Sequence, residues 1–170
     1  MKKQFFTLSI YTENKVGLLN RVTSIFLRRH INIESLTVSE SEIKDAHRFT
    51  LVVKTSEEQI KKIVGQLEKQ VEVIKAYYHT ADETIFQEIA LYKIATENLY
   101  EGNLQGIIKQ HYASIVEVNK EFIVVEKSGD YESTQQLYNE LRPYGMLQFV
   151  RSGRIAVTKP KMNISGILNQ

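Results

Sequence analysis

Two kinds of hydrophobic period alternate along this chain, and their order restricts the fold more than any other feature. Apolar residues recur at every second position between Phe5 and Tyr11, a period typical of a half-buried strand. From Leu18 to Phe26 they recur instead at the spacing of one helical face. Because a strand turns alternate side chains to one face and a helix turns every third or fourth, the chain is predicted to begin with a strand and an amphipathic helix.

The next fifty or so residues contain further elements of both kinds. These elements are strands at residues 31–38, 49–53 and 71–78 and a helix at residues 60–67. The helix is expected to start after Ser56, which suits a helix cap. In the second strand the apolar positions change parity near Glu34 and Ser35, which predicts a β-bulge there. The predicted order of elements is βαββαβ.

The same order is repeated after a polar stretch at residues 80–84. The repeated elements are strands at residues 85–95, 115–118, 122–125 and 146–150, helices at residues 104–111 and 134–141, and a last extended segment at residues 154–157. The second of these helices is predicted to stop at Pro143, which cannot continue the backbone hydrogen-bond ladder. The fold class is therefore predicted as α+β, with two ferredoxin-like βαββαβ domains in tandem.

The predicted domain boundaries follow from these patterns. We expect a first domain at residues 1–79, a linker at 80–84, a second domain at 85–158 and a flexible tail at 159–170, which shows little periodicity. Two helices cover only one face of a four-stranded sheet, and units this small seldom leave the other face bare. We therefore expect a homodimer that forms through sheet edges or faces.

Bulk composition narrows the function classes. The chain carries 22 Lys and Arg against 20 Asp and Glu, and the two signs are interspersed. Nucleic-acid-binding proteins concentrate positive charge, so this balance favours a small-molecule or protein partner. The absence of cysteine excludes disulfides, thiolate metal sites and a cysteine nucleophile. The absence of cysteine also fits a cytoplasmic location. No membrane association is expected, because no apolar run approaches the length of about 18 residues that a membrane-spanning helix needs.

Catalytic and metal-binding patterns are not found in the sequence. The four histidines are scattered, whereas metal sites usually place their ligands at short fixed spacings. The βαββαβ order is shared with RNA-recognition domains, but the third strand, residues 46–53, has one aromatic residue and no glycine. We therefore expect no catalytic residues, no metal, no cofactor and no nucleic-acid partner.

The turn between the first strand and the first helix is the most distinctive local feature. Gly17 stands at the predicted helix start, where the amides have no intrahelical partner and carry the positive end of the helix dipole. A carboxylate suits such amides, and glycine lets the backbone approach it without a Cβ. Asn14 adds a donor and an acceptor. Asn32, at the start of the next strand, could accept from an ammonium group, and Ile33 is among the apolar residues that could line a wall.

The same residues also fit an ordinary turn. In that interpretation Asn14 and Gly17 form a turn with a helix cap, and Asn32 satisfies a loop. Spacing alone leaves both interpretations open.

Two motifs at this turn resemble a known family. The pattern N-x-x-G-x-L-x-R-V at residues 14–22, followed by N-I-E-S-L-T-V at residues 32–38, is similar to the start of the small, regulatory subunit of acetolactate synthase. The second half is similar to the same family at residues 88–94 and, most clearly, at residues 150–157. The resemblance therefore extends over nearly the whole chain.

This resemblance implies an N-terminal ACT domain, which binds amino acids at a dimer interface, and a C-terminal ferredoxin-like domain. In this family the subunit has no active site of its own. It binds the thiamine-diphosphate-dependent catalytic subunit, raises its activity and confers feedback inhibition by valine or another branched-chain amino acid. Carried over by motif, the effector site consists of Asn14 and Gly17 in the turn, with Asn32 from the other protomer, and we add the adjacent Leu18 and Ile33.

An alternative function uses the same turn but gives no weight to the second half. In that case the chain is a free-standing ACT-domain amino-acid sensor that acts on another enzyme or on a transcription factor.

Three positions depart from the family pattern. His30 stands after the first helix where glycine is frequent, so a positive φ at this position would be strained. Lys15 occupies a turn position that is commonly acidic or small, and Asn20 stands where serine is frequent. These positions bear on which effector binds and how tightly.

Overall fold

The computed structural model describes residues 2–98, 102–162, 164 and 166 of the chain. The chain divides into two compact units, which we call the first unit (residues 1–85 and 154–170) and the second unit (residues 86–153). No helix among the described residues is long and apolar enough to cross a membrane.

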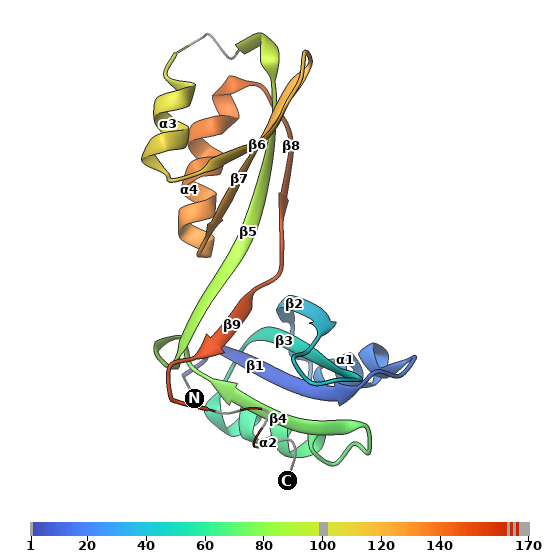
Figure 1. The fold of residues 1–170 in the computed structure, drawn as a ribbon. Helices are drawn as coiled ribbons and strands as arrows, with labels where there is room; N and C mark the ends of the chain where they lie inside the picture. Colours follow the sequence, from blue (N-terminus) through green and yellow to red (C-terminus); the bar gives the residue numbers. More distant parts are fainter. Residues whose placement is uncertain (1, 99–101, 163, 165, 167–170) are drawn as a thin grey trace. The chain divides into compact units, whose positions relative to one another are not determined.

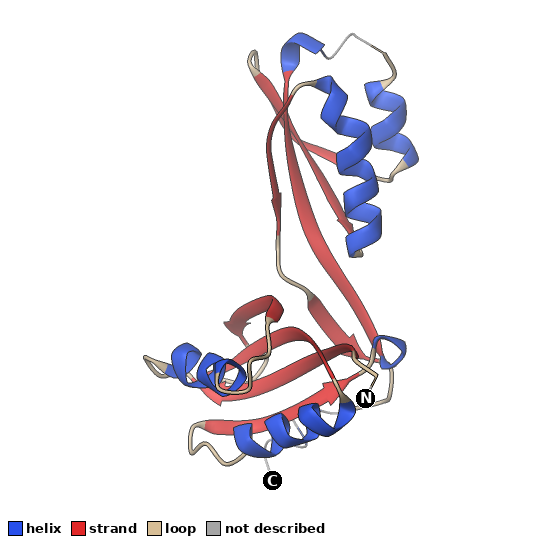
Figure 2. Cartoon of the chain, turned by 180° about the vertical axis from the view of Figure 1, so that it is seen from behind, coloured by secondary structure: helices blue, strands red, loops and turns tan. Residues whose placement is uncertain are grey.

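The first unit is a four-stranded antiparallel sheet with two helices on one face (Figures 1 and 2). Its elements are β1 (Gln4–Glu13), α1 (Leu18–Leu27), β2 (Ile33–Glu40), β3 (Ala46–Thr55), α2 (Glu57–Leu67), β4 (Val73–His79), the 3-10 turn η1 (Ala81–Glu83) and the C-terminal strand β9 (Ile155–Thr158). The strand order is β2-β3-β1-β4. The predicted βαββαβ order is therefore confirmed for this half of the chain.

The core of the first unit lies between the sheet and its two helices. It is made of alternate residues of the strands and the inner faces of the helices, among them Phe6, Leu8, Ile10, Leu51, Val22, Phe26, Ile60 and Ile63. The predicted bulge is confirmed, because the register of β2 against β3 shifts between Ile33 and Ser35. The prediction that Val71 belongs to the fourth strand is wrong. Val71 is 92% exposed and lies in the turn that follows α2, where the Val73 amide donates to the Gln70 carbonyl at 3.1 Å.

The second face of this sheet is covered by the chain's own C-terminal segment. Thr7, Ser9 and Tyr11 point away from the helices, yet at most 4% of each is exposed. The Arg154 amide donates to Ser35 Oγ at 2.7 Å, and Thr37 Oγ1 donates to the Arg154 carbonyl at 3.0 Å. The chain itself therefore covers this face where residues 154–162 cross it, a long-range contact that the sequence pattern did not show.

The predicted linker and tail have the following local structure. Thr80 and Glu83 form a capping box around η1, so part of residues 80–84 is ordered as a 3-10 turn. In the tail, the Lys159 amide donates to the Glu83 carbonyl at 2.9 Å. Residues 163, 165 and 167–170 lie outside the described residues, and the flexibility of the tail remains a prediction.

The second unit repeats the arrangement with the strand order β6-β7-β5-β8. Its elements are β5 (Thr84–Ala95), which begins in the first unit, η2 (Thr96–Asn98), α3 (Leu104–Gln110), β6 (Ser114–Val118), β7 (Phe122–Gly129), α4 (Tyr131–Leu141), η3 (Arg142–Tyr144) and β8 (Met146–Arg151). Helices α3 and α4 lie together on one face of the sheet (Figure 1). The chain is thus α+β with two ferredoxin-like units, as predicted.

Helix α4 is held to the second sheet by a buried tyrosine. Tyr92 on β5 is fully buried, and its hydroxyl donates to the Thr134 carbonyl at 2.7 Å. Burial raises the pKa of Tyr92 to about 12, so the hydroxyl stays protonated and keeps this bond at neutral pH. The helix ends at Leu141, two residues before Pro143, as the sequence predicts.

Candidate effector site

Gly17 has the backbone conformation that only glycine adopts readily. It precedes α1 with φ +85° and ψ −3°, in the left-handed region. A Cβ built at this position would meet no atom within 4 Å. The requirement for glycine therefore comes from the backbone conformation and not from crowding within the chain, and the space beside the turn is open.

The N-terminus of α1 is not satisfied by any side chain among the described residues. Gly17 provides no cap, and the first turn carries no acidic residue. The first intrahelical bond joins the Arg21 amide to the Gly17 carbonyl at 3.2 Å, which leaves the amides of residues 18–20 without an intrahelical acceptor. Leu18 is 4% exposed and anchors this turn in the core, so the free amides are held in place.

The other two long helices show a different arrangement. Ser56 caps α2 by accepting from the Gln59 amide, and Asp130 caps α4 by accepting from the Ser133 amide at 2.8 Å. Both helices also carry acidic residues in the first turn. Helix α1 therefore has a free anion-binding end where α2 and α4 have internal anions or caps.

The charges next to this turn are paired within the chain. Lys15 contacts the Glu13 carboxylate, and Arg21 contacts the Glu72 carboxylate. The hydrogen bond to Glu13 raises the pKa of Lys15. The cation that departs from the family pattern is thus offset by a neighbouring acid, and the amides remain the positive groups at the turn.

Asn14 lies beside the same turn but faces another depression. The backbone amide of Asn14 donates to the Asp45 carbonyl at 3.1 Å. Asn14 also lines a depression of about 220 Å³ with residues 40–41 and 43–47. Asn14 and Gly17 are therefore neighbours at the end of β1, where the structure places them both in solvent-exposed positions.

Asn32 and Ile33 lie at the opposite end of the sheet. Glu13 at the end of β1 pairs with Ala46, whereas Ile33 at the start of β2 pairs with Val53 on the same strand β3. A seven-residue stretch of strand spans about 23 Å. Asn32 donates through Nδ2 to Glu34 at 3.1 Å and lines a separate pocket of about 590 Å³. One chain therefore does not bring the five predicted residues into one pocket.

His30 ends α1 in a strained conformation. Its φ is +52°. The His30 amide donates to the Leu27 carbonyl at 3.0 Å and the Ile31 amide to the Phe26 carbonyl at 3.1 Å. This is the bond pattern of a Schellman motif, in which the left-handed residue is usually glycine. His30 therefore has the positive φ that the sequence analysis described as strained for a residue with a Cβ.

The variant His30→Gly is expected to raise the free energy of unfolding by about 1 kcal/mol, because glycine removes the left-handed penalty of a residue with a Cβ. Chemical denaturation measures this change. His30→Ala keeps the Cβ and is the matched control, with no gain expected. Tyr112 ends α3 in the same way with φ +52°, so Tyr112→Gly should show a similar gain. A loss of stability in both glycine variants would contradict the assignment of strain.

Sequence reasoning did not identify a group of residues on the outer face of the first sheet. Tyr11 of β1 faces Arg48 of β3 across the ladder, and both line a pocket with Tyr77 of β4. The signal in the sequence was weak, since it consisted only of an aromatic residue in phase with Thr7 and Ser9. No cluster of three potential metal ligands occurs among the residues that the structure describes.

Both halves of the chain match models of one known family. A family model described as the small subunit of acetolactate synthase matches residues 87–160, and a model of the ACT domain of this small subunit type matches residues 8–75. The acetolactate synthase small subunit of Mycolicibacterium smegmatis is 35% identical over 153 residues, which cover 90% of each chain. That of Bacillus subtilis is 34% identical over 158 residues, which cover 92% of this chain and 91% of the relative.

The fold has a similar solved relative. The crystal structure of the acetolactate synthase small subunit from Thermotoga maritima superposes with a TM-score of 0.84 at 25% identity, and the match covers 94% of this chain and 99% of that one.

Proposed function

Since this chain belongs to the family of acetolactate synthase small subunits, we propose that it is a non-catalytic regulatory subunit of acetolactate synthase. In this proposal it activates the catalytic subunit and confers feedback inhibition by a branched-chain amino acid, with valine as the favoured effector. The observation that carries the effector site is the uncapped N-terminus of α1 behind Gly17. A similarity that extends over both units favours this function over that of a free-standing sensor.

In this proposal the effector carboxylate accepts from the amides of residues 18–20, where the helix dipole and three free donors act together. Gly17 keeps the approach to these amides open, and Asn14 lies at its edge. The ammonium group of the effector is bound by Asn32 of a second protomer, because Asn32 of the same chain lies at the far end of the sheet. Ile33 of that protomer contributes apolar surface.

The homodimer is part of this proposal. The sheet face opposite α3 and α4 supports it, because Ile89, Leu91 and Val150 are 43%, 42% and 50% exposed there. The proposal also includes the predicted domain boundaries, which are a first domain at residues 1–79, a linker at 80–84, a second domain at 85–158 and a flexible tail at 159–170. It further includes a cytoplasmic location.

Effector binding regulates the enzyme if it favours one arrangement of the subunits over another. A coupling of about 1–3 kcal/mol is typical of such linkage. Discrimination among valine, leucine and isoleucine should be modest, because one methylene in an apolar pocket contributes about 1–3 kcal/mol.

Reconstitution tests this function. Purified chain is added to the catalytic subunit of the same organism, and acetolactate formation is measured with and without valine, leucine and isoleucine. The rate is expected to rise on addition, and valine is expected to inhibit only the reconstituted enzyme. If the chain changes neither the rate nor the response to any of the three amino acids, the proposal is wrong.

A further inference from the structure

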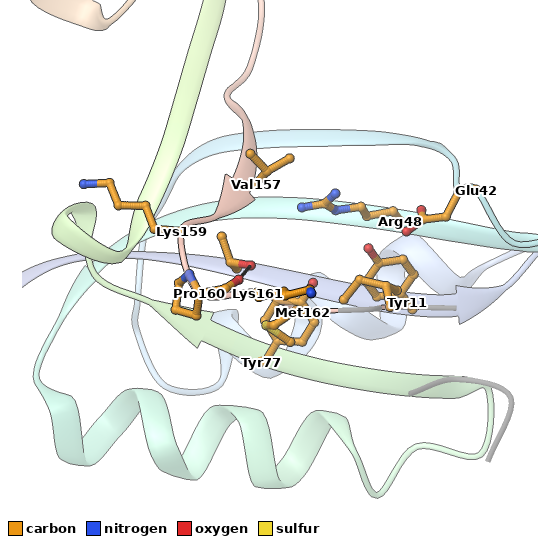
Figure 3. A pocket seen from close by; sticks show the side chains of 11 residues that line it. Tyr11, Glu42, Arg48, Tyr77, Val157, Lys159, Pro160, Lys161 and Met162 are labelled. Atoms are coloured by element: carbon orange, nitrogen blue, oxygen red, sulfur yellow. Dashed lines mark hydrogen bonds between the residues drawn. The ribbon is translucent and has the colours of Figure 1, made fainter. Parts of the chain in front are cut away.

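A pocket of about 630 Å³ lies on the outer face of the first sheet, beneath the C-terminal segment (Figure 3). We call it the outer-face pocket. The sheet contributes Tyr11, Glu42, Arg48 and Tyr77, and the segment contributes residues 157–162 and Ile164. Its volume lies within the range of about 300–1,000 Å³ that small-molecule sites occupy. Because α1 packs on the other face of the sheet, this pocket is separate from the proposed effector site.

Arg48 supplies a buried donor that no described residue uses. One terminal nitrogen donates to Ser9 Oγ at 3.1 Å and to the Ala156 carbonyl at 2.5 Å, which fixes the guanidinium between sheet and segment. Its Nε is buried and has no hydrogen-bond partner among the described residues. The guanidinium carbon lies 5.6 Å from the centre of the Tyr11 ring.

Tyr11 supplies a second donor of the same kind. The residue is fully buried, and its hydroxyl makes no hydrogen bond of ordinary geometry in the part of the chain that the structure describes, although the Tyr77 side chain lies near enough to contribute to its raised pKa. Burial raises the pKa of Tyr11, so its hydroxyl remains protonated at neutral pH and is able to donate. Buried polar groups are nearly always partnered in folded proteins. Two donors from adjacent strands at one pocket therefore indicate an acceptor that the described residues do not supply.

The other walls define the rest of the ligand. Lys159 and Lys161 join Arg48 as cations, against the single acid Glu42, so the lining has an excess of positive charge. Tyr77 stacks beside Tyr11 with ring centres 6.3 Å apart, and Val157, Pro160 and Met162 add apolar surface (Figure 3). The lining thus suits an anionic head on an apolar body, and Glu42 disfavours a second negative charge.

We propose that the outer-face pocket binds a small organic carboxylate with an apolar body. The carboxylate accepts from Arg48 Nε and the Tyr11 hydroxyl, which a charged acceptor satisfies more strongly than a neutral one. The body lies against Tyr77 and Met162. Because the segment forms one wall, a bound ligand also holds residues 157–162 on the sheet.

Calorimetry with benzoate on the full chain tests this proposal. Benzoate is expected to bind, and the neutral isostere benzamide to bind at least about tenfold more weakly, because it lacks the charge-assisted bonds. Tyr11→Phe removes only the hydroxyl and is expected to weaken benzoate binding about tenfold. Tyr131→Phe, on the exposed start of α4, is the matched control and should leave binding unchanged. Hydrogen exchange of residues 157–162 should slow when benzoate is added.

Measuring the stability of the Tyr11→Phe variant distinguishes a loss of the binding site from a loss of folding. Its midpoint of thermal unfolding should be no lower than that of the wild type, since the lost hydroxyl has no hydrogen-bond partner among the described residues. If benzoate does not bind, or binds equally to the wild type and Tyr11→Phe, the donors are satisfied by water and the proposal is wrong. Tighter binding of inorganic phosphate than of benzoate would overturn the carboxylate assignment. Gly17→Asp should not change benzoate binding, so failure here is distinguishable from failure of the effector site.

Discussion

Replacing Gly17 with aspartate is expected to weaken effector affinity about 10- to 100-fold. The new carboxylate would lie beside the free amides of α1, where the carboxylate of the effector is proposed to bind, and would compete for the same donors. A hydrogen bond to a charged group contributes about 1.5–3 kcal/mol, which corresponds to this range. Titration calorimetry with valine measures the loss. Apart from its chain neighbours, no described residue lies within 4 Å of a Cβ at this position, so the variant carries only the left-handed backbone penalty of about 1–2 kcal/mol and should fold.

The neutral isostere provides the control for this variant. Gly17→Asn has nearly the same shape as Gly17→Asp and tolerates the left-handed backbone equally well, but it carries no charge. It should therefore lose less affinity than the aspartate variant. Equal affinities of Gly17→Asp and the wild type for valine would exclude this turn as the effector site.

Replacing Phe26 with alanine is expected to lower the free energy of unfolding of the first unit by about 3–5 kcal/mol, the range for truncating a buried aromatic residue. Phe26 is fully buried between α1 and the sheet, and its carbonyl accepts from the Ile31 amide. The variant therefore loosens both the helix that carries the free amides and the start of β2. Urea denaturation measures the stability, and valine affinity should fall with it.

The control for this variant lies in the other unit. Leu137 on α4 is also fully buried, and Leu137→Ala should cost about 2–5 kcal/mol in the second unit. Since no residue of the proposed effector site lies in that unit, valine affinity should stay unchanged. A Phe26→Ala variant that loses less than about 1 kcal/mol would show that α1 is not held by this core.

The secondary structure was predictable because its signals are local. The change of parity near Glu34 and Ser35 located the bulge in β2, and Pro143 located the end of α4. Val71 was assigned to a strand because it is apolar and in phase with Val73. Val71 instead lies in the turn after α2, which the alternation of apolar residues does not reveal.

The candidate site was predictable only in part. Gly17 lies at the helix start as its sequence context indicates, and its φ of +85° shows why the position holds glycine. Asn32 is only fifteen residues further on, yet α1 carries it to the other end of the sheet. Closeness in sequence therefore did not indicate closeness in space, and a site shared between protomers is what unites these residues in the proposal.

The sequence by itself determined the two βαββαβ units, the glycine at the start of α1 and the family to which the chain is similar, because each depends on residues that are near one another or on a motif. Only the tertiary structure decided that residues 154–162 cover the outer face of the first sheet and that the Tyr11 hydroxyl and Arg48 Nε are buried there with no hydrogen-bond partner among the described residues. Contacts between Thr37 and Arg154 join residues 117 positions apart. Such contacts form because folding buries surface from segments that are far apart in the sequence. The local hydrophobic pattern does not show which distant segments are buried together.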